Sequence, residues 1–355
     1  MYITGARFPG RYIQAPGLIA RLGEESKSLG SRALVILDNF LASRLDAAVR
    51  AGAAPLAVEL MVHGGECSES EIARGVAAGK AASTDLVIGV GGGKALDTAK
   101  AVAFRLGGLP TVIVPTIAAS DAPCSALAVV YRDDHTVDYD YFLPRNPDLV
   151  LVDTQIVAEA PARFLAAGIG DALATWYEAE SSRQADAPNC WGTHGSPLAF
   201  HIARFCLDTI VENGADALAE CDAGTAGPAF EKVVEANILL SGAGFESGGV
   251  AGAHAIHHGL CELPDVHHHL HGEKVAIGVL ATLLIHGRRD EFRKVRDYCA
   301  SVRLPTKLAD IGIAEVTEEK LRKVGERACR PGEIMENEPI RITPDMVVAA
   351  LRELV

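Results

Sequence analysis

Short apolar runs that alternate with helical stretches dominate the first half of the sequence and constrain its fold more than any other feature. The runs are rich in β-branched residues, as in strands buried on both faces. They are residues 33–37, 56–62, 86–90, 111–114 and 149–152. Stretches with helical spacing lie between them, at 18–29, 41–52, 69–82 and 94–106. This alternation predicts a Rossmann-like parallel sheet with helices on both faces and ligands at the carboxyl ends of its strands.

The second half differs from the first because its composition is helical almost throughout. We place the boundary at Ala160-Pro161, between an α/β domain of residues 1–160 and an all-helical domain of residues 161–355. The first helix of the second domain is expected to open at Gly168, with Asp171 at its N-cap. Further helices are expected near 198–212, 228–243, 247–261, 272–287 and 290–302. The cleft between two such domains is a common place for an active site.

A glycine-rich turn follows the apolar run at 86–90. It reads Gly91-Gly92-Gly93-Lys94 and leads directly into a predicted helix. Glycines let a backbone approach a ligand closely, and a helix N-terminus directs free N–H groups at an anion, so a diphosphate fits here. The turn is not the usual GxGxxG fingerprint, and a tight strand-to-helix turn is the alternative. Asp38, at the end of the first run, either accepts from a ribose hydroxyl or caps a helix.

A long loop without periodicity, Pro115–Ser125, follows the run at 111–114. It is rich in small and hydroxyl residues and holds one carboxylate, Asp121. Binding residues collect in loops at strand ends, so Asp121 either holds a substrate hydroxyl or caps a turn. Beyond this loop, residues 126–131 and 136–142 predict a β-hairpin.

Seven of the twelve histidines lie between His254 and His271. Imidazole is the commonest metal ligand, and predicted helices flank the cluster on both sides, which favours a buried site over a solvated loop. No HExxH motif is present, which argues against a zincin protease. A carboxylate with two imidazoles would form a catalytic zinc or ferrous site. Spacing alone leaves three candidates for the carboxylate, namely Asp171, Glu246 and Asp265.

The composition excludes several classes of function. A net charge of −13 without basic runs argues against nucleic acid or an anionic membrane as partner. The apolar fraction of 49% with 22% charged residues is that of a globular protein. Eight cysteines without a CxxC pair, and no signal-like or membrane-length apolar stretch, predict reduced thiols and a cytoplasmic location.

Five motifs, in one order along the chain, carry a resemblance to a known family. They are Gly89–Lys100, Pro115–Ser125, Pro161–Glu180, Phe245–Gly259 and His267–Ala276. Together they resemble the glycerol dehydrogenase branch of the group-III, iron-dependent-type alcohol dehydrogenases. The last fifth of the chain matches this family only loosely.

The resemblance implies a set of site residues. Asp171, His254 and His271 match the family's metal ligands, which also contact the substrate, and Asp121 matches the carboxylate that contacts the polyol. The implied contacts of the cofactor, NAD, are Asp38, Gly91, Gly92, Gly93, Lys94, Asp97, Thr116, Ala119, Ser125, Leu127 and Tyr131. One departure is His269-Leu270, where the family has two aromatic residues, and this change bears on substrate preference.

The resemblance also implies an activity: oxidation of glycerol to dihydroxyacetone and the reverse, by hydride transfer to NAD from an alcohol ionised at zinc or Fe²⁺. The base that takes the proton stays open between water and a histidine such as His258. The alternatives are a reductase of other small hydroxycarbonyls, a dehydrogenase of another 1,2-diol or polyol, a lyase resembling dehydroquinate synthase, and a metal store without catalysis. A small polyol is the expected partner, together with further copies of the chain in a homo-oligomer.

Overall fold

A six-stranded parallel sheet forms the core of the first half of the chain. The computed structural model describes residues 1–132 and 137–355. The strand order is β2-β9-β6-β5-β3-β4, and every neighbouring pair is parallel. The strands are β2 (Tyr12–Ala15), β3 (Arg32–Leu37), β4 (Ala57–Val62), β5 (Leu86–Gly91), β6 (Thr111–Pro115) and β9 (Leu149–Asp153). The prediction of a parallel sheet is confirmed, and the edge strand β2, four half-buried residues long, is the one that it missed.

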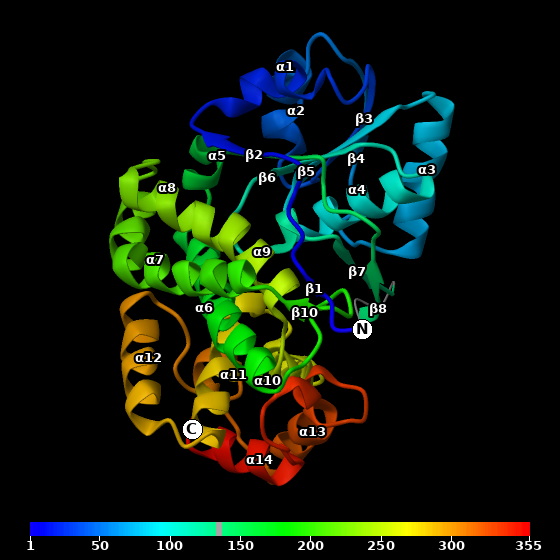
Figure 1. Cartoon of the computed structure of the whole chain (residues 1–355). Helices are drawn as coiled ribbons and strands as arrows, with labels where there is room; N and C mark the ends of the chain where they lie inside the picture. The colour runs from blue at the N-terminus through cyan, green and yellow to red at the C-terminus, as the bar shows by residue number, and fades with distance from the viewer. Residues whose placement is uncertain (133–136) are drawn as a thin grey trace.

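Helices cover the sheet on both faces, because successive side chains of a strand point to opposite sides. Ala33, Val35 and Leu37 of β3 pack with helices α1 and α2, whereas Leu34 and Ile36 pack with α3 and α4. The four helices are α1 (Leu22–Ser26), α2 (Ala42–Gly52), α3 (Glu69–Ala81) and α4 (Gly93–Arg105). Figure 1 shows this α/β part in blue and cyan above the green, yellow and red helices of the second half.

An antiparallel hairpin lies beside the sheet, as the sequence predicts. Strand β7 (Leu127–Tyr131) pairs with β8 (Val137–Phe142). Thr136 and residues 133–135 of the predicted hairpin lie outside the described residues. A shorter pair joins the two halves of the chain, since β1 (Thr4–Gly5) runs parallel to β10 (His194–Gly195).

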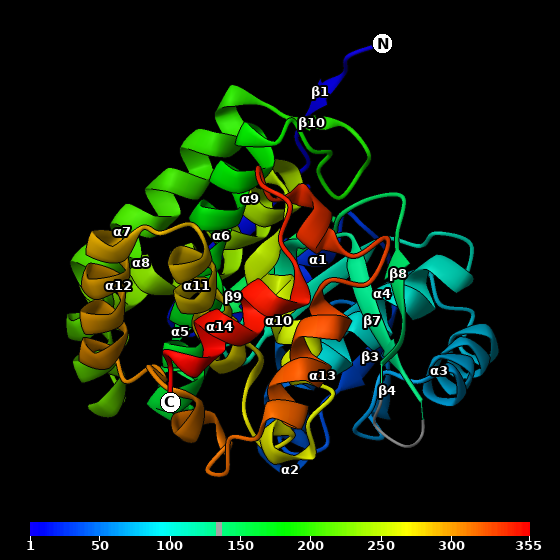
Figure 2. The same cartoon turned by 90° about the horizontal axis from the view of Figure 1, so that it is seen from below.

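Beyond β9 the chain is helical apart from β10. The elements of this part are α5 (Thr154–Ala158), α6 (Ala162–Gln184), α7 (Pro197–Asp222), α8 (Pro228–Glu235), a π-helical segment (Ala236–Leu240), α9 (Ser241–Gly248), α10 (Gly252–Leu260), α11 (His271–Ile285), α12 (Arg289–Ser301), α13 (Glu318–Ala328) and α14 (Pro344–Arg352). In the view from below, α13 and α14 lie across α10 and α11 (Figure 2), and these helices are in contact. The predicted fold class is therefore confirmed.

Asp171 is not a helix N-cap, so that prediction is wrong. Helix α6 begins nine residues earlier, at Ala162, and Asp171 lies inside it. Gly168 and Gly170, which suggested a helix start, serve close packing instead. A Cβ on Gly168 would lie 1.9 Å from the carbonyl oxygen of Ala118, and one on Gly170 would lie 2.4 Å from that of Gly272. These two glycines let α6 touch both the loop after β6 and the start of α11.

The helix expected over residues 247–261 is shorter than predicted. Gly249 adopts a φ of 110°, which a residue with a side chain rarely takes, and the chain turns there. Helix α10 therefore begins at Gly252, and the preceding residues belong to α9. This turn points the start of α10 at the middle of α6.

Candidate active site

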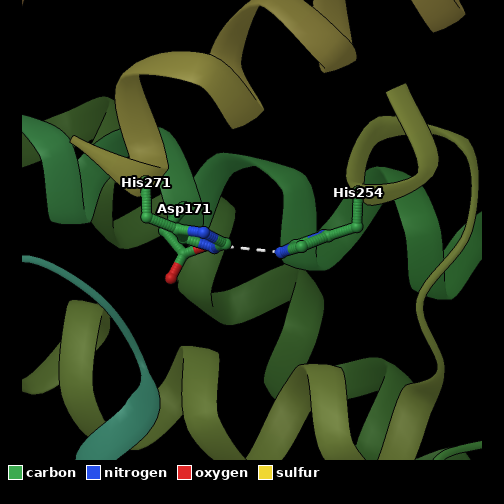
Figure 3. A group of neighbouring side chains, drawn as sticks. All are labelled: Asp171, His254 and His271. Carbon is green, nitrogen blue, oxygen red and sulfur yellow. Dashed lines mark hydrogen bonds and ion pairs between the residues drawn. The ribbon is translucent and has the colours of Figure 1, made fainter. Parts of the chain in front are cut away.

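Three side chains from three helices meet at one point. Asp171 comes from the middle of α6, His254 from the first turn of α10, and His271 is the first residue of α11. Each offers one ligand atom, and these atoms all lie within 4.8 Å of one another. Figure 3 shows both rings turned toward the carboxylate. The structure thus brings together the three residues that the resemblance implies as metal ligands.

The separations between these ligand atoms suit a small divalent ion. The Nε2 atoms of His271 and His254 lie 3.1 Å and 3.5 Å from Oδ1 of Asp171. Metal–ligand bonds of about 2.0–2.1 Å at tetrahedral angles place two ligand atoms roughly 3.3 Å apart. One carboxylate and two imidazoles also leave a coordination position open, as in catalytic zinc or ferrous sites. The residues present therefore fit a metal ion.

Glu178 fixes the orientation of His254, and sequence reasoning missed it. Its Oε2 accepts the Nδ1–H of His254 over 2.6 Å, and its Oε1 accepts the backbone N–H groups of His254 and Ala251. A carboxylate behind a ligand imidazole sets its tautomer and raises its basicity. Helical spacing in the sequence could have indicated Glu178, because it lies seven residues after Asp171 and so shares its face of the helix.

Asp121 lies directly beside the cluster. It precedes a short 3-10 helix (Ala122–Cys124), and its backbone N–H donates to Oδ2 of Asp171 over 3.2 Å. Its own Oδ2 accepts the hydroxyl of Ser241 over 3.0 Å, and that hydroxyl also contacts Thr175. The loop after β6 thus delivers a second, half-buried carboxylate to the point where the α/β and helical parts meet.

The charges of the cluster favour a cation at its centre. Burial alone raises the pKa of Asp171, but His271 and His254 outweigh it and hold that pKa well below its usual range. Burial lowers the pKa of His254, yet Glu178 and Asp171 hold it well above its usual value. Burial, and then the charge of Asp171, raise the pKa of Asp121. The carboxylates therefore stabilise positive charge here, whether protons or a metal ion carry it.

The glycine turn has the geometry expected of an anion site. Strand β5 ends at Gly91, and α4 begins at Gly93 with Gly92 as an N-cap that offers no side-chain cap. A Cβ on Gly93 would meet nothing within 4 Å, so open space faces the start of the helix. The carboxylate of Asp38, at the end of the neighbouring strand, accepts the N–H of Gly92 over 3.4 Å. Asp38 thus touches the same turn.

The other residues implied as cofactor contacts come from the start of α4, the loop after β6 and strand β7. Lys94 pairs with Glu66 and lies 5.2 Å from the ring centre of Tyr131. Leu127 and Tyr131 occupy the less buried face of β7. Thr116 donates its backbone N–H to Gly91. Of the rest, Ala119 is half-buried and Ser125 is buried.

Asp97 has an interior role in the structure. Its two oxygens accept from the ammonium group of Lys100 over 3.1 Å and from the backbone N–H of Val129 over 3.0 Å. Lys100 in turn donates to the carbonyl oxygens of Ala122 and Leu127. This buried pair supports the loop that carries Asp121, and a contact between Asp97 and a cofactor stays a prediction.

The other carboxylates considered as ligands are engaged elsewhere. Glu246 is buried and accepts from the backbone of Ala126 and from the side chain of Asn146, over 2.7 and 2.5 Å. Asp265 pairs with Lys320. Geometry, which spacing could not supply, therefore selects Asp171.

The remaining histidines of the cluster divide into separate roles. His257 is buried and contacts His271, whereas His258 pairs with Glu333 over 3.1 Å. His267 and His268 are exposed. His269 pairs with Glu273, whose carboxylate also accepts the N–H of Leu270, so the departing dipeptide lies directly before α11 and Leu270 is its N-cap.

Known proteins are similar to this chain over nearly its full length. Residues 9–154 match the family described as iron-containing alcohol dehydrogenase. A glycerol dehydrogenase of Thermotoga maritima is 51% identical, over 99% of this chain and 96% of that protein. A glycolaldehyde reductase of Halobacterium salinarum is 40% identical, over 97% and 94% of the two chains. The structure of a probable glycerol dehydrogenase from Sinorhizobium meliloti 1021 superposes with a TM-score of 0.94 at 44% identity, covering 99% of this chain and 98% of that one.

A parallel sheet joined to a helical part, one carboxylate and two imidazoles at their junction, and these relatives together define an oxidoreductase of the alcohol dehydrogenase type. The chain belongs to the iron-containing alcohol dehydrogenase family. The resemblance drawn from the five motifs is confirmed.

Proposed function

We propose that this protein is an NAD-dependent and metal-dependent glycerol dehydrogenase, which oxidises glycerol to dihydroxyacetone and catalyses the reverse reaction. The observation that carries the proposal is the cluster of Asp171, His254 and His271 with the carboxylate of Asp121 beside it. The relative from Thermotoga maritima, which this chain matches almost from end to end, is named for the same activity.

Each site residue has a distinct task in this reaction. A divalent ion held by the three ligands would act as a Lewis acid and lower the pKa of an alcohol, as it does that of water. Asp121 orients a hydroxyl of the polyol by hydrogen bonding, because its carboxylate lies beside the ligands and is anchored by Ser241. Glu178 keeps the ring of His254 fixed, so the ligand geometry is formed before substrate arrives.

NAD would supply the hydride acceptor, and the protein orients it. We propose that its diphosphate lies at the uncapped start of α4, against Gly91, Gly92 and Gly93, with Lys94 as the nearby cation. Asp38 would accept from the adenosine ribose and repel the 2′-phosphate of NADP. Asp97, Thr116, Ala119, Ser125, Leu127 and Tyr131 complete the proposed set.

Several wider features belong to the same proposal. The chain divides at Ala160-Pro161 into a cofactor-binding and a metal-binding domain, with the substrate between them. Zinc is the proposed ion, and the ligand set also suits Fe²⁺. The enzyme works in the cytoplasm as a homo-oligomer. No helix among residues 1–132 and 137–355 has the length and apolar character needed to cross a membrane.

The decisive experiment follows the formation of NADH. Purified protein stripped of metal and then reloaded with zinc should reduce NAD when glycerol or another 1,2-diol is added, and the stripped protein should not. The variant His271→Ala should lose turnover while its circular dichroism stays that of the wild type. Zinc-loaded protein that reduces no NAD with any 1,2-diol would refute the proposal.

A second candidate is reduction of a small hydroxycarbonyl compound. The observation that favours it is the 40% identity to a glycolaldehyde reductase. Comparing kcat/KM for glycerol, 1,2-propanediol, dihydroxyacetone, glycolaldehyde and methylglyoxal separates the two. A kcat/KM for glycolaldehyde far above that for dihydroxyacetone would favour the second candidate.

A further inference from the structure

His257 is the buried histidine of the cluster that has no task in the reaction described so far. It lies on α10, one turn after His254, and 9% of its surface is exposed. Its Nε2 lies 3.1 Å from Nδ1 of His271, and the two ring centres are 4.4 Å apart. The contact therefore reaches His271 on the nitrogen that faces away from Asp171.

The chemistry of an imidazole ligand fixes the direction of this hydrogen bond. His271 presents Nε2 to Asp171 and so to the proposed metal position. An imidazole that binds a metal through Nε2 needs its lone pair there, and the neutral ring then carries its hydrogen on Nδ1. That hydrogen points at Nε2 of His257, which must accept it.

The surroundings of His257 agree with an acceptor at Nε2. The same atom lies 3.4 Å from Sγ of Cys261, and a thiol is a weak donor. Two potential donors therefore converge on Nε2. Nδ1 of His257 is buried and has no hydrogen-bond partner among the described residues, so no contact there holds the ring in the opposite tautomer.

We propose that His257 is a positioning residue, which accepts the Nδ1–H of His271 and thereby holds the Nε2 lone pair of His271 toward the metal ion. The inference rests on the proposed metal site and adds to it a residue that is neither a ligand nor a substrate contact. The two ligand histidines then differ in their support. His254 donates to a carboxylate, Glu178, whereas His271 donates to a neutral imidazole.

This difference has a consequence for metal binding. A carboxylate acceptor raises the basicity of a ligand imidazole more than a neutral acceptor does, so His271 is the weaker of the two imidazole ligands. Without an acceptor at 3.1 Å, the ring of His271 loses the contact that fixes its tautomer and its rotation about χ2. Loss of such support typically weakens metal affinity by about 10–100-fold.

The test is an equilibrium measurement of zinc affinity by competition with a chelator, on the full-length protein. His257→Leu keeps the volume and removes the acceptor, and His257→Gln keeps an acceptor at a similar reach. We expect zinc to bind His257→Leu about 10–100-fold more weakly than wild type, and His257→Gln within roughly threefold of it. His268→Ala, in the exposed part of the same cluster, is the matched control and should leave the affinity unchanged.

A second readout separates positioning from packing. The visible spectrum of cobalt-loaded protein reports ligand geometry, and it should change in His257→Leu and be restored in His257→Gln. Cys261→Ala should leave zinc affinity unchanged, because the thiol is only a second donor to Nε2. Wild-type affinity and spectrum in His257→Leu would overturn the inference, as would a loss in Cys261→Ala as large as that in His257→Leu.

The outcomes also distinguish this inference from the proposed function. Wild-type protein that binds no zinc would overturn the metal site itself and the role of His257 with it. Zinc bound equally well by wild type and His257→Leu would overturn only the role of His257. If His257→Leu does not fold, the comparison of His257→Gln with His257→Asn replaces it. The Asn amide is too short to reach Nδ1 of His271, so His257→Asn should bind zinc more weakly.

Discussion

His254 donates its Nδ1–H to Glu178 over 2.6 Å, and this contact turns Nε2 of the same ring toward Asp171. The two residues lie on different helices, so one hydrogen bond fixes both the tautomer of a ligand and the approach of α10 to α6.

Replacing Glu178 is therefore expected to weaken the metal site without altering its ligands. Glu178→Gln keeps the shape of the side chain and removes its charge, and we expect zinc affinity to fall about 10–100-fold. The measurement is chelator competition at fixed pH. Glu180→Gln, two residues along the same helix, is the control, because Glu180 pairs with Arg288 away from the cluster. Equal affinities in the wild type and Glu178→Gln would contradict the role given to Glu178.

Asp121 is expected to act on substrate rather than on metal. Asp121→Asn keeps the size of the side chain but removes the charge that would orient a polyol hydroxyl. A hydrogen bond to a charged group contributes about 1.5–3 kcal/mol, so kcat/KM for glycerol should fall roughly 10- to 150-fold. Zinc affinity should change much less than kcat/KM, because Asp121 contacts Asp171 through its backbone N–H, which the substitution leaves in place. Asp216→Asn, at an exposed position on α7, should alter neither quantity.

Gly91, at the end of β5, and Gly93, at the start of α4, should respond differently to replacement by alanine. Gly91 has a φ of 154°, and a Cβ there would lie 2.6 Å from Cβ of Asp38, so Gly91→Ala should destabilise the fold by about 1–3 kcal/mol. Gly93→Ala meets no atom within 4 Å and should fold normally. Its methyl group would occupy the space proposed for the diphosphate, so NAD should bind more weakly. Thermal unfolding and calorimetric titration with NAD measure the two effects, and wild-type NAD affinity in Gly93→Ala would argue against a diphosphate at this turn.

Removing one partner of the buried ion pair between Lys100 and Asp97 should lower the free energy of unfolding strongly. Lys100→Met leaves Asp97 charged and buried, and removal of one partner of such a pair destabilises a protein by about 3–5 kcal/mol. The double variant Asp97→Asn with Lys100→Met should regain part of this loss. Denaturant unfolding measures both, and Lys27→Met, in an exposed pair, should change stability by less than about 1 kcal/mol. A double variant no more stable than Lys100→Met would show that the charge of Asp97 is not the cause.

Glu333 should contribute to loss of stability in acid. Burial raises the pKa of Glu333, but His258 and Arg327 outweigh it and lower the pKa to about 2. Because the folded-state pKa lies below that of an unfolded glutamate, about 4.3, the contribution is complete above that pH and is lost as the pH falls toward about 2. Glu333→Gln should flatten the dependence of unfolding free energy on pH between about 4.5 and 2. An unchanged slope would show that another group governs this range.

Much of the α/β part was predictable because local pattern and tertiary structure agree there. β3, β5, β6 and β9 are continuous apolar runs, and burial on both faces demands such runs. The glycine turn could be predicted for the same reason, because its three consecutive glycines are a local signal for the backbone conformation of the turn. β2 was missed because it is short and half-buried at the edge of the sheet, so no periodicity marks it.

The candidate site was less predictable, because its roles depend on contacts between distant segments. From local sequence alone, Gly168 and Gly170 suggest the start of a helix. In the structure, glycine is needed there because the backbones of Ala118 and Gly272 pack closely against α6. Sequence spacing could not choose Asp171 over Glu246 as the metal ligand. Both carboxylates are buried, and only the tertiary contacts show that the histidines surround Asp171 and not Glu246. Family resemblance supplied that choice, and the structure gives its physical reason.

The hydrogen bond from the backbone N–H of Asp121 to Asp171 joins the loop after β6 to a proposed metal ligand. An ion that draws electrons from the Asp171 carboxylate would weaken this bond, which ends a loop that begins next to Gly91. Thermodynamic linkage requires the reverse effect to be equal: a dinucleotide that shifts the loop alters the affinity for the ion by the same factor. The amide of Asp121 is thus a contact through which a displacement of this loop by a dinucleotide would reach the proposed metal ligand Asp171.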